Sequence, residues 1–189
     1  MPGCGCRGHL LHDEEELTGP GFTLRRATPS DAQELARCVG EGFAGYRSFA
    51  PPGWQPPAEV SDPEPIAERL RDPEVWAMVA ELEGELAGHV SFVPARSSRW
   101  GSPDASLAHL WQLFVRAQYW GSGVAATLHG AAVAEAADRG FTSIRLYTPA
   151  GQARARRFYE REGWTTRGAP FLSQDLGLKL VEYRRPLVA

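Results

Sequence analysis

Lysine is almost missing from this 189-residue sequence: Lys179 is the single lysine, and arginine supplies the rest of the 20 basic residues. The 23 Asp and Glu residues outnumber them, which gives a net charge of −3 at pH 7. This balance argues against a general nucleic-acid-binding protein, which would carry an excess of basic residues. Long apolar runs are missing as well, and no stretch approaches the roughly 18 residues that a membrane-spanning helix needs.

Cysteine is also scarce, since three residues are too few for a disulfide scaffold. Residues 1–20 lack the apolar core of a secretory signal, so we expect a cytoplasmic protein with no membrane partner. Cys4, Cys6, His9 and His12 lie close together, but zinc patterns separate two ligand pairs by about a dozen residues or more. We therefore expect no metal site and a disordered tail over residues 1–20.

Apolar residues make up 43% of the chain, enough for one core, so we expect one folded domain over residues 21–189. Hydrophobic periodicity predicts the element order β-α-α-β-β-β-α-β-α-β-β. Alternating strands and helices in the second half favour an α/β fold with a partly parallel, mixed sheet. The predicted strands are 22–26, 75–81, 86–93, 107–115, 141–148, 164–167 and 178–185, and the predicted helices are 28–40, 66–71, 124–139 and 152–162.

Two segments interrupt this pattern of regular elements. We expect Gly40 and Gly42 to end the first helix. Six prolines between residues 43 and 65 exclude a regular helix or central strand there, and the aromatic residues among them argue against plain disorder. Residues 43–65 are therefore predicted to form a long functional loop. A wide connection, residues 169–177, is predicted within the final hairpin.

The stretch Leu113 to Ala125 is the most informative part of the sequence. A buried strand ends at Val115, a short loop with Gly121 and Gly123 follows, and a helix begins. Glycines allow close backbone approach to a ligand, and a helix N-terminus offers unpaired N–H donors, so the stretch predicts a phosphate or pyrophosphate cradle. A strand-to-helix turn that uses glycines only for their backbone freedom would show the same sequence pattern. The spacing is neither a Walker A loop nor G-x-G-x-x-G, which disfavours nucleotide hydrolysis and NAD binding.

Four motifs occur in order along the chain: Leu24-Arg-Arg-Ala-Thr-Pro-Ser-Asp-Ala, Trp120-Gly-Ser-Gly-Val-Ala, Gln152-Ala-Arg-Ala-Arg-Arg-Phe-Tyr-Glu-Arg-Glu-Gly-Trp, and Val181-Glu-Tyr-Arg-Arg. With these motifs the sequence resembles the GCN5-related N-acetyltransferase (GNAT) superfamily from about Phe22 to the C-terminus. Trp120 departs from the family's usual Arg or Gln, and Gln152 replaces Asn. The resemblance implies a single-domain mixed sheet with splayed central strands.

The resemblance also implies acetyl-coenzyme A as cosubstrate. In that family the pantetheine arm pairs with the strand before the glycine loop, and the loop amides hold the pyrophosphate. Arginines crowd the last helix; most fit a solvated face, and Arg154 is the candidate for the 3′-phosphate. The implied coenzyme-binding residues are Leu113, Phe114, Val115, Trp120, Gly121, Ser122, Gly123, Val124, Ala125, Gln152 and Arg154.

The transfer needs a neutral amine, yet an alkylamine with a pKa near 10 is mostly protonated at pH 7, so a general base is expected. His109 is the first candidate, because alternation places it on one face with Trp111, Leu113 and Val115. His89 and Glu41 are further candidates. By resemblance, Tyr159 donates a proton to the leaving thiolate. Structural roles, a packed helix tyrosine and a core histidine, are the alternatives for Tyr159 and His109, and we read His129 as structural.

The predicted function is direct acetyl transfer, in a ternary complex, to a small, partly apolar and cationic amine. Two alternatives stay open: acetylation of a protein N-terminus or lysine, and a catalytically silent acyl-coenzyme A sensor. The final hairpin and exposed aromatics are candidates for a homodimer contact. The predicted acceptor-binding residues are Tyr46, Phe49, Trp54, Trp111 and Phe171.

Overall fold

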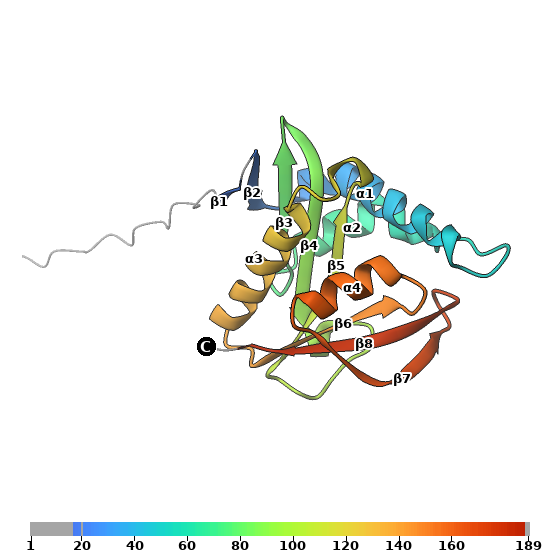
Figure 1. Cartoon of the computed structure of the whole chain (residues 1–189). Helices are drawn as coiled ribbons and strands as arrows, with labels where there is room; N and C mark the ends of the chain where they lie inside the picture. The colour runs from blue at the N-terminus through green and yellow to red at the C-terminus, as the bar shows by residue number, and fades with distance from the viewer. Residues whose placement is uncertain (1–16, 20, 188–189) are drawn as a thin grey trace, which may run out of the picture.

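The computed structural model describes residues 17–19 and 21–187, which form one eight-stranded mixed sheet in the order β1-β2-β3-β4-β5-β6-β8-β7 (Figure 1). Only β5 and β6 pair in parallel; the other neighbours are antiparallel. The predicted mixed α/β fold is confirmed. The strands are β1 Leu17–Gly19, β2 Phe22–Arg26, β3 Trp76–Leu82, β4 Glu85–Pro94, β5 Leu107–Val115, β6 Ser143–Pro149, β7 Thr165–Ser173 and β8 Leu178–Pro186, and the α-helices are α1 Ala32–Ala44, α2 Pro63–Leu70, α3 Val124–Asp138 and α4 Ala153–Arg161.

Strand β1 corrects the predicted boundary of the N-terminal tail. Residues 17–19 pair antiparallel with β2, Leu17 opposite Leu24, although the sequence analysis placed them in the tail. An edge strand this short has no hydrophobic period, so its pairing depends on backbone hydrogen bonds that the pattern does not reveal. The cluster Cys4, Cys6, His9 and His12 lies outside the described residues.

Helices cover both faces of the sheet (Figure 1). On one face, Leu35 and Cys38 of α1 pack with Val79 and Leu86 of the sheet. On the other face, α3 and α4 pack over the larger core cluster, which includes Leu128 of α3. This three-layer arrangement buries the apolar stripe of each helix, which is the main source of its stability.

The central strands β5 and β6 separate soon after they begin to pair. Their parallel ladder covers three residue pairs, from Leu107 opposite Ser143 to His109 opposite Arg145. Beyond His109, β5 stays paired with β4 on its other side as far as Val115. The β6-facing backbone groups of residues 110–115 therefore have no strand partner, which confirms the predicted splay.

A β-bulge at Trp111 changes which face of the sheet each residue of β5 occupies. Val93 lies opposite His109 and Ser91 lies opposite Gln112, so β5 has one residue more than β4 in between. Directly opposed residues of an antiparallel pair share a face, so His109 and Gln112 lie on the same side of the sheet.

The bulge corrects the prediction that His109, Trp111, Leu113 and Val115 share one face. Strict alternation holds only for an unbroken strand, and the extra residue inverts it from Gln112 onward. His109 therefore shares the α1 and α2 face with Phe114, which packs against Phe43 of α1. Leu113 and Val115 belong to the core on the α3 and α4 face.

Helix α1 runs through Gly40 and Gly42 and ends at Ala44, so the prediction that these glycines end it is wrong. Gly42 serves close packing instead. A Cβ atom on Gly42 would lie 2.2 Å from Cδ1 of Phe114, so the absence of a side chain lets α1 approach β5.

Helix α2 and strand β7 also extend further than predicted. Helix α2 begins at Pro63, because the Asp62 carboxylate accepts a 3.0 Å hydrogen bond from the N–H of Glu64 and proline suits the first turn. Strand β7 continues to Ser173, with a register shift between Arg167 and Phe171. The predicted wide connection is therefore a turn of residues 174–177.

Substitution of the two helix-interior glycines Gly42 and Gly130 by alanine should have opposite effects. Gly42→Ala forces a methyl group into the Phe114 ring and should lower the free energy of unfolding by about 1–3 kcal/mol. A Cβ atom on Gly130 of α3 would have nothing within 4 Å, so Gly130→Ala should raise the free energy of unfolding by about 0.5–1 kcal/mol through helix propensity. Urea denaturation measures both, and a neutral Gly42→Ala would contradict the close approach of α1 to β5.

Candidate active site

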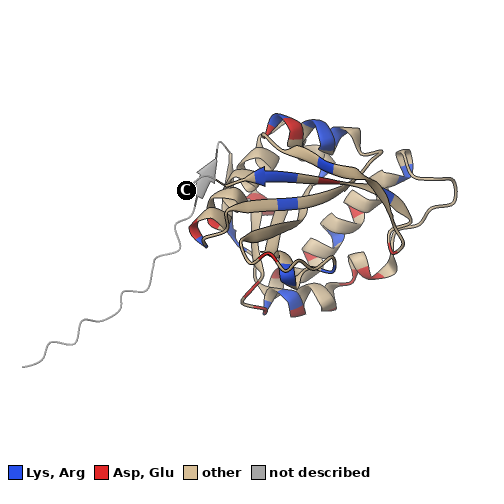
Figure 2. Cartoon of the chain, turned by 90° about the horizontal axis from the view of Figure 1, so that it is seen from below, with Lys and Arg blue, Asp and Glu red and all other residues tan. Residues whose placement is uncertain are grey.

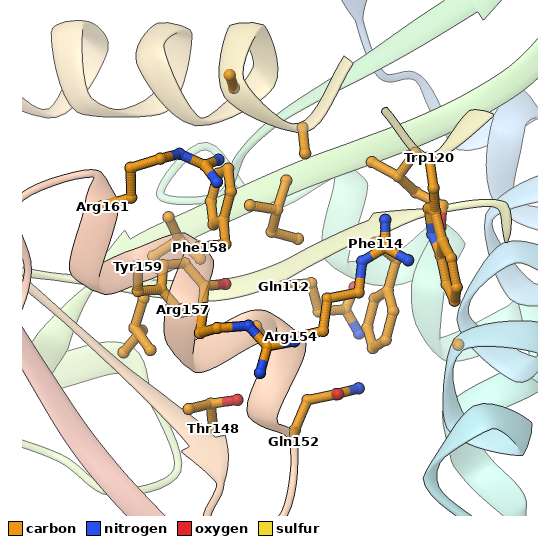
Figure 3. A pocket seen from close by; sticks show the side chains of 18 of the residues that line it. Gln112, Phe114, Trp120, Thr148, Gln152, Arg154, Arg157, Phe158, Tyr159 and Arg161 are labelled. Atoms are coloured by element: carbon orange, nitrogen blue, oxygen red, sulfur yellow. The ribbon is translucent and has the colours of Figure 1, made fainter. Parts of the chain in front are cut away.

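A cleft of about 510 Å³ occupies the gap between the splayed strands. One wall comes from β5 and the loop that follows it, and the other comes from the end of β6 and from α4 (Figure 3). Of the residues predicted to bind the coenzyme, all line this cleft except Ser122 and Val124, which belong to the same loop. Several lining residues were not predicted from the sequence, among them Gln112, Tyr119, Thr148, Arg157, Phe158 and Arg161.

The glycine loop forms a cradle of free backbone donors at one end of the cleft. Gly121 and Gly123 have φ of 87° and 90°, and Gly123 is the N-cap of α3. At the start of α3, the N–H of Thr127 donates a 3.0 Å hydrogen bond to the carbonyl oxygen of Gly123. The amides of residues 124–126, which precede it, have no backbone acceptor in the described chain. Free amides at a helix N-terminus carry partial positive charge, so the loop suits an anion.

Three arginines of α4 extend the positive charge along the cleft. Arg154, Arg157 and Arg161 line it, and their spacing of three and four residues places them on one helix face (Figure 3). Arg156 points elsewhere and donates to the Tyr183 hydroxyl at 3.1 Å. The helical spacing could have identified Arg157 and Arg161, which the sequence analysis assigned to a solvated face.

Trp120 and Arg154 connect the two walls of the cleft. The guanidinium carbon of Arg154 lies 3.5 Å from the centre of the Trp120 ring, an arrangement typical of a cation–π contact (Figure 3). The indole N–H of Trp120 donates to the carbonyl oxygen of Val115 at 2.8 Å, which fixes the ring beside β5. Trp120, the departure from the family motif, is thus a structural part of the cleft.

Tyr159 of α4 lies at the bottom of the cleft with 7% of its surface exposed. Its ring packs against Phe158, Trp164 and Tyr183. Its hydroxyl makes no hydrogen bond within the described part of the chain. Burial, with a smaller contribution from Tyr46, raises the pKa of Tyr159 above its usual value, so the hydroxyl keeps its proton at neutral pH.

A second cavity of about 200 Å³ lies on the α1 and α2 face, next to the cleft. The two cavities share five lining residues, so they adjoin at the splay. The second cavity also carries charged side chains from four different elements of the chain. The shared residues are Tyr46, Trp111, Gln112, Phe114 and Tyr147, and the charged residues of the second cavity are Glu59, Arg69, Arg99 and Asp175.

His109 lines the second cavity and not the cleft. Its imidazole is 1% exposed and packs against the rings of Trp100 and Tyr147, with both centroids 5.6 Å away. Neither ring nitrogen has a hydrogen-bond partner among residues 21–187. Burial, together with the charge of Arg145, lowers the pKa of His109 to about 3, so the ring is neutral at pH 7.

The other candidate bases line neither cavity. Nε2 of His89 lies 3.1 Å from Oε1 of Gln112, and burial lowers the pKa of His89 to about 4. Glu41 is 54% exposed at its side chain and pairs with Arg116 at 3.4 Å. His129 accepts a 2.8 Å hydrogen bond from the indole of Trp164 in the core, which fits a structural role.

Two of the five predicted acceptor-binding residues, Tyr46 and Trp111, line both cavities. Phe49, Trp54 and Phe171 line neither. Phe49 packs on Gly151, where a Cβ atom would lie 2.7 Å from its ring, and Trp54 donates to the carbonyl oxygen of Leu176 at 2.6 Å. These contacts fasten the loop after α1 onto the turns that follow β6 and β7.

Phe171 lies on β7 instead of in a connecting loop, and its ring meets that of Tyr147 edge-on at 5.5 Å. It therefore supports a wall residue of both cavities without reaching the cavities itself. The sequence shows which aromatic residues belong to the same segment, but tertiary packing decides which of them reach the cavities.

Charged residues of both signs alternate over the ribbon in the view of Figure 2. Within the described ranges, no three His, Cys, Asp or Glu side chains gather into a group that could hold a metal ion. None of the helices in that part of the chain has the length and the apolar stretch that a bilayer crossing requires.

Several solved structures share this fold. The ribosomal-protein-alanine N-acetyltransferase of Brucella melitensis is 24% identical, with 87% of this chain and 99% of that chain covered and a TM-score of 0.67. PaiA N-acetyltransferase of Thermoplasma acidophilum, solved with coenzyme A, is 14% identical, with 85% and 97% covered and a TM-score of 0.66. YncA of Salmonella typhimurium, solved with acetyl-coenzyme A, is 16% identical, with 89% and 95% covered and a TM-score of 0.69.

No curated protein matches the sequence significantly. The sequence model of the Acetyltransferase (GNAT) family matches residues 43–164, which is more than half of the chain. This range includes the splayed strands, the glycine loop and the arginine face of α4, the features that build the cleft. The chain therefore belongs to the GNAT family of acetyltransferases.

Proposed function

We propose that this acetyltransferase moves the acetyl group of acetyl-coenzyme A to the amine of a small molecule, by direct attack in a ternary complex. In this reaction a C–N bond forms and the C–S bond of the thioester breaks. The amine loses one proton and the sulfur gains one. The observation that carries the proposal is the pair of adjoining cavities, one lined by free amides and arginines that suit a polyanion and one of only about 200 Å³.

The cleft fits the coenzyme chemically along its length. The free amides of residues 124–126 and the two glycines would hold the pyrophosphate. Arg154 and Arg157, which have no ion pair in the described chain, would bind phosphate groups. The unpaired edge of β5 offers backbone groups to the amides of the pantetheine arm. When bound, acetyl-coenzyme A supplies an activated acyl thioester.

The second cavity supports a small acceptor. Its volume of about 200 Å³ lies below the roughly 300–1,000 Å³ of pockets for drug-sized ligands. The loop after α1 crosses this side and is fastened through Trp54 to the β7–β8 turn. A peptide would need an open groove at this place. The Brucella neighbour is named as a protein acetyltransferase, but it is only 24% identical to this chain, so the likeness concerns the fold and does not indicate the acceptor.

In the proposed reaction Tyr159 is the proton donor. Its hydroxyl has no hydrogen-bond partner among the described residues, and the side chain lines the cleft. The hydroxyl stays protonated, because burial raises its pKa. The proton on Oη would stabilise the negative charge that develops on the leaving sulfur.

His109 is the proposed partner of the acceptor amine. A neutral imidazole has one unprotonated nitrogen, and neither ring nitrogen of His109 has a partner among the described residues. Because both nitrogens are buried, the surrounding rings would have to shift for this nitrogen to accept a hydrogen bond from the amine N–H. The lowered pKa of His109 means that it does not store the proton, which passes on to water. His89 is held by Gln112 and Glu41 by Arg116, so neither has this freedom.

Gly123→Asp should abolish tight binding of acetyl-coenzyme A. The new carboxylate would stand in the cradle beside the free amides and repel the pyrophosphate. We expect a loss of affinity of at least about 10-fold in calorimetry. Gly140→Asp is the matched control, because Gly140 also has a positive φ (83°) but lies at the far end of α3, outside the cleft. Wild-type affinity in Gly123→Asp would place the cradle elsewhere.

Tyr159→Phe should lower kcat by about 10²–10⁴-fold, because general acid catalysis contributes this much, while acetyl-coenzyme A affinity stays within a few-fold. Release of free thiol over a panel of amines gives kcat. Tyr183→Phe is the control: it removes a buried hydroxyl that bonds Arg156 and Glu160 outside the cleft. If both variants keep full activity, Tyr159 has a packing role alone. Binding without turnover in the wild type would favour the sensor alternative.

The pH profile of kcat/KM tests the proposed state of His109. Since its pKa is lowered to about 3, His109 is neutral throughout pH 5–9, and the rise of activity with pH should follow deprotonation of the acceptor amine. His109→Gln should reduce the plateau and leave the midpoint of the acidic limb unchanged. A wild-type limb near pH 6–7 that vanishes in His109→Gln would show an ordinary, proton-storing histidine.

A further inference from the structure

The second cavity has one charged pair and two charges without a pair. Arg99 forms an ion pair with Asp175. Arg69 and Glu59 have no ion pair within the described residues, and the guanidinium of Arg69 makes no hydrogen bond there either. An arginine at a cavity wall whose guanidinium has no protein partner keeps its N–H donors available for a ligand.

Arg69 is held in place although nothing neutralises it. Its guanidinium carbon lies 3.9 Å from the centre of the Trp111 ring, so the indole supports its face and leaves its N–H donors free. Desolvation and the like charge of Arg99 lower the pKa of Arg69 from its usual value, a direction that a bound anion would oppose.

The position of Arg69 links it to the reacting end of the acceptor. Trp111, on which it stacks, is the bulge residue of β5 and lines both cavities. A group held by Arg69 therefore lies beside the place where the cavities meet. His109, the proposed partner of the amine, lines the same cavity. Glu59 lies in the short 3₁₀ helix over residues 58–61 and lines the second cavity but not the cleft.

We propose that the acceptor is a small amine that also carries a carboxylate, that is, an amino-acid-like molecule, and that Arg69 binds the carboxylate. The planar guanidinium matches the two carboxylate oxygens in a way that a lysine would not. The inference rests on the acetyl transfer proposed above and adds the substrate class. It replaces the cationic acceptor that the net charge of the sequence suggested.

Matched pairs of amines test the inference with the full-length protein. Thiol release is measured with leucine and isoamylamine, with phenylalanine and phenethylamine, and with leucinamide, which keeps the amine but neutralises the carboxylate. We expect kcat/KM, expressed per concentration of neutral amine, to be about 10–100-fold higher for each amino acid than for its decarboxylated partner, the usual range for a hydrogen-bonded charge pair. Arg69→Gln should remove this preference through KM, and Arg69→Lys should restore part of it.

Arg71→Gln is the matched control, because it removes the same charge from the exposed C-cap of α2, outside both cavities. It should leave the preference intact, and both variants should bind acetyl-coenzyme A with wild-type affinity. Equal rates on amino acids and decarboxylated amines, or an equal loss on both in Arg69→Gln, would overturn the inference. Faster turnover of leucinamide would also overturn it and would indicate a peptide N-terminus as acceptor.

The outcome for the proposed function itself is separate. If no amine of the panel releases thiol while calorimetry shows acetyl-coenzyme A binding, small-molecule acetyl transfer fails, and the proposed substrate class fails with it. If amines without a carboxylate are acetylated well, acetyl transfer stands and the role of Arg69 fails.

Discussion

The early end of pairing between β5 and β6 is the constraint on which the rest of this structure depends. Backbone hydrogen bonds join the strands at Leu107–His109 and nowhere beyond. A continuous ladder would leave no cleft, no unpaired edge on β5 and no room for α4 to face the glycine loop. The fold thus leaves polar backbone groups unsatisfied at its centre, which is costly unless a ligand completes them. The free amides at the start of α3 extend the same principle to the end of the cleft.

The bulge at Trp111 converts this single gap into two different cavities. Because it inverts the alternation of β5, it sends Gln112 and Phe114 toward α1 and α2, and Leu113 and Val115 toward α3 and α4. One strand therefore supplies walls for both the cleft and the second cavity. Bulges beside functional sites commonly redirect side chains in this way.

The sequence predicted the parts of the molecule that local chemistry dictates. The loop after β5 needs positive φ at Gly121 and Gly123, and glycine is the residue type that adopts this conformation readily. Long-range contacts could not be predicted. Nothing in the sequence indicates the bulge, so His109 was wrongly predicted to share a face with Leu113 and Val115. Phe49 and Trp54 lie in the loop after α1, as predicted. Phe49 packs on Gly151 and Trp54 donates a hydrogen bond to Leu176, and these partners lie in distant segments of the sequence.

The contact between Gly42 and Phe114 makes the side chains that fit at these two distant positions of the chain depend on each other. A side chain at position 42 is tolerated only if residue 114 becomes smaller, since a Cβ atom would otherwise lie 2.2 Å from the ring. Phe114 in turn lines both cavities. Gly42 lines the cleft as well, so an exchange at either position would reshape the boundary between the two cavities. Paired changes at positions 42 and 114 would thus alter the shape of both cavities without any change in Tyr159 or His109.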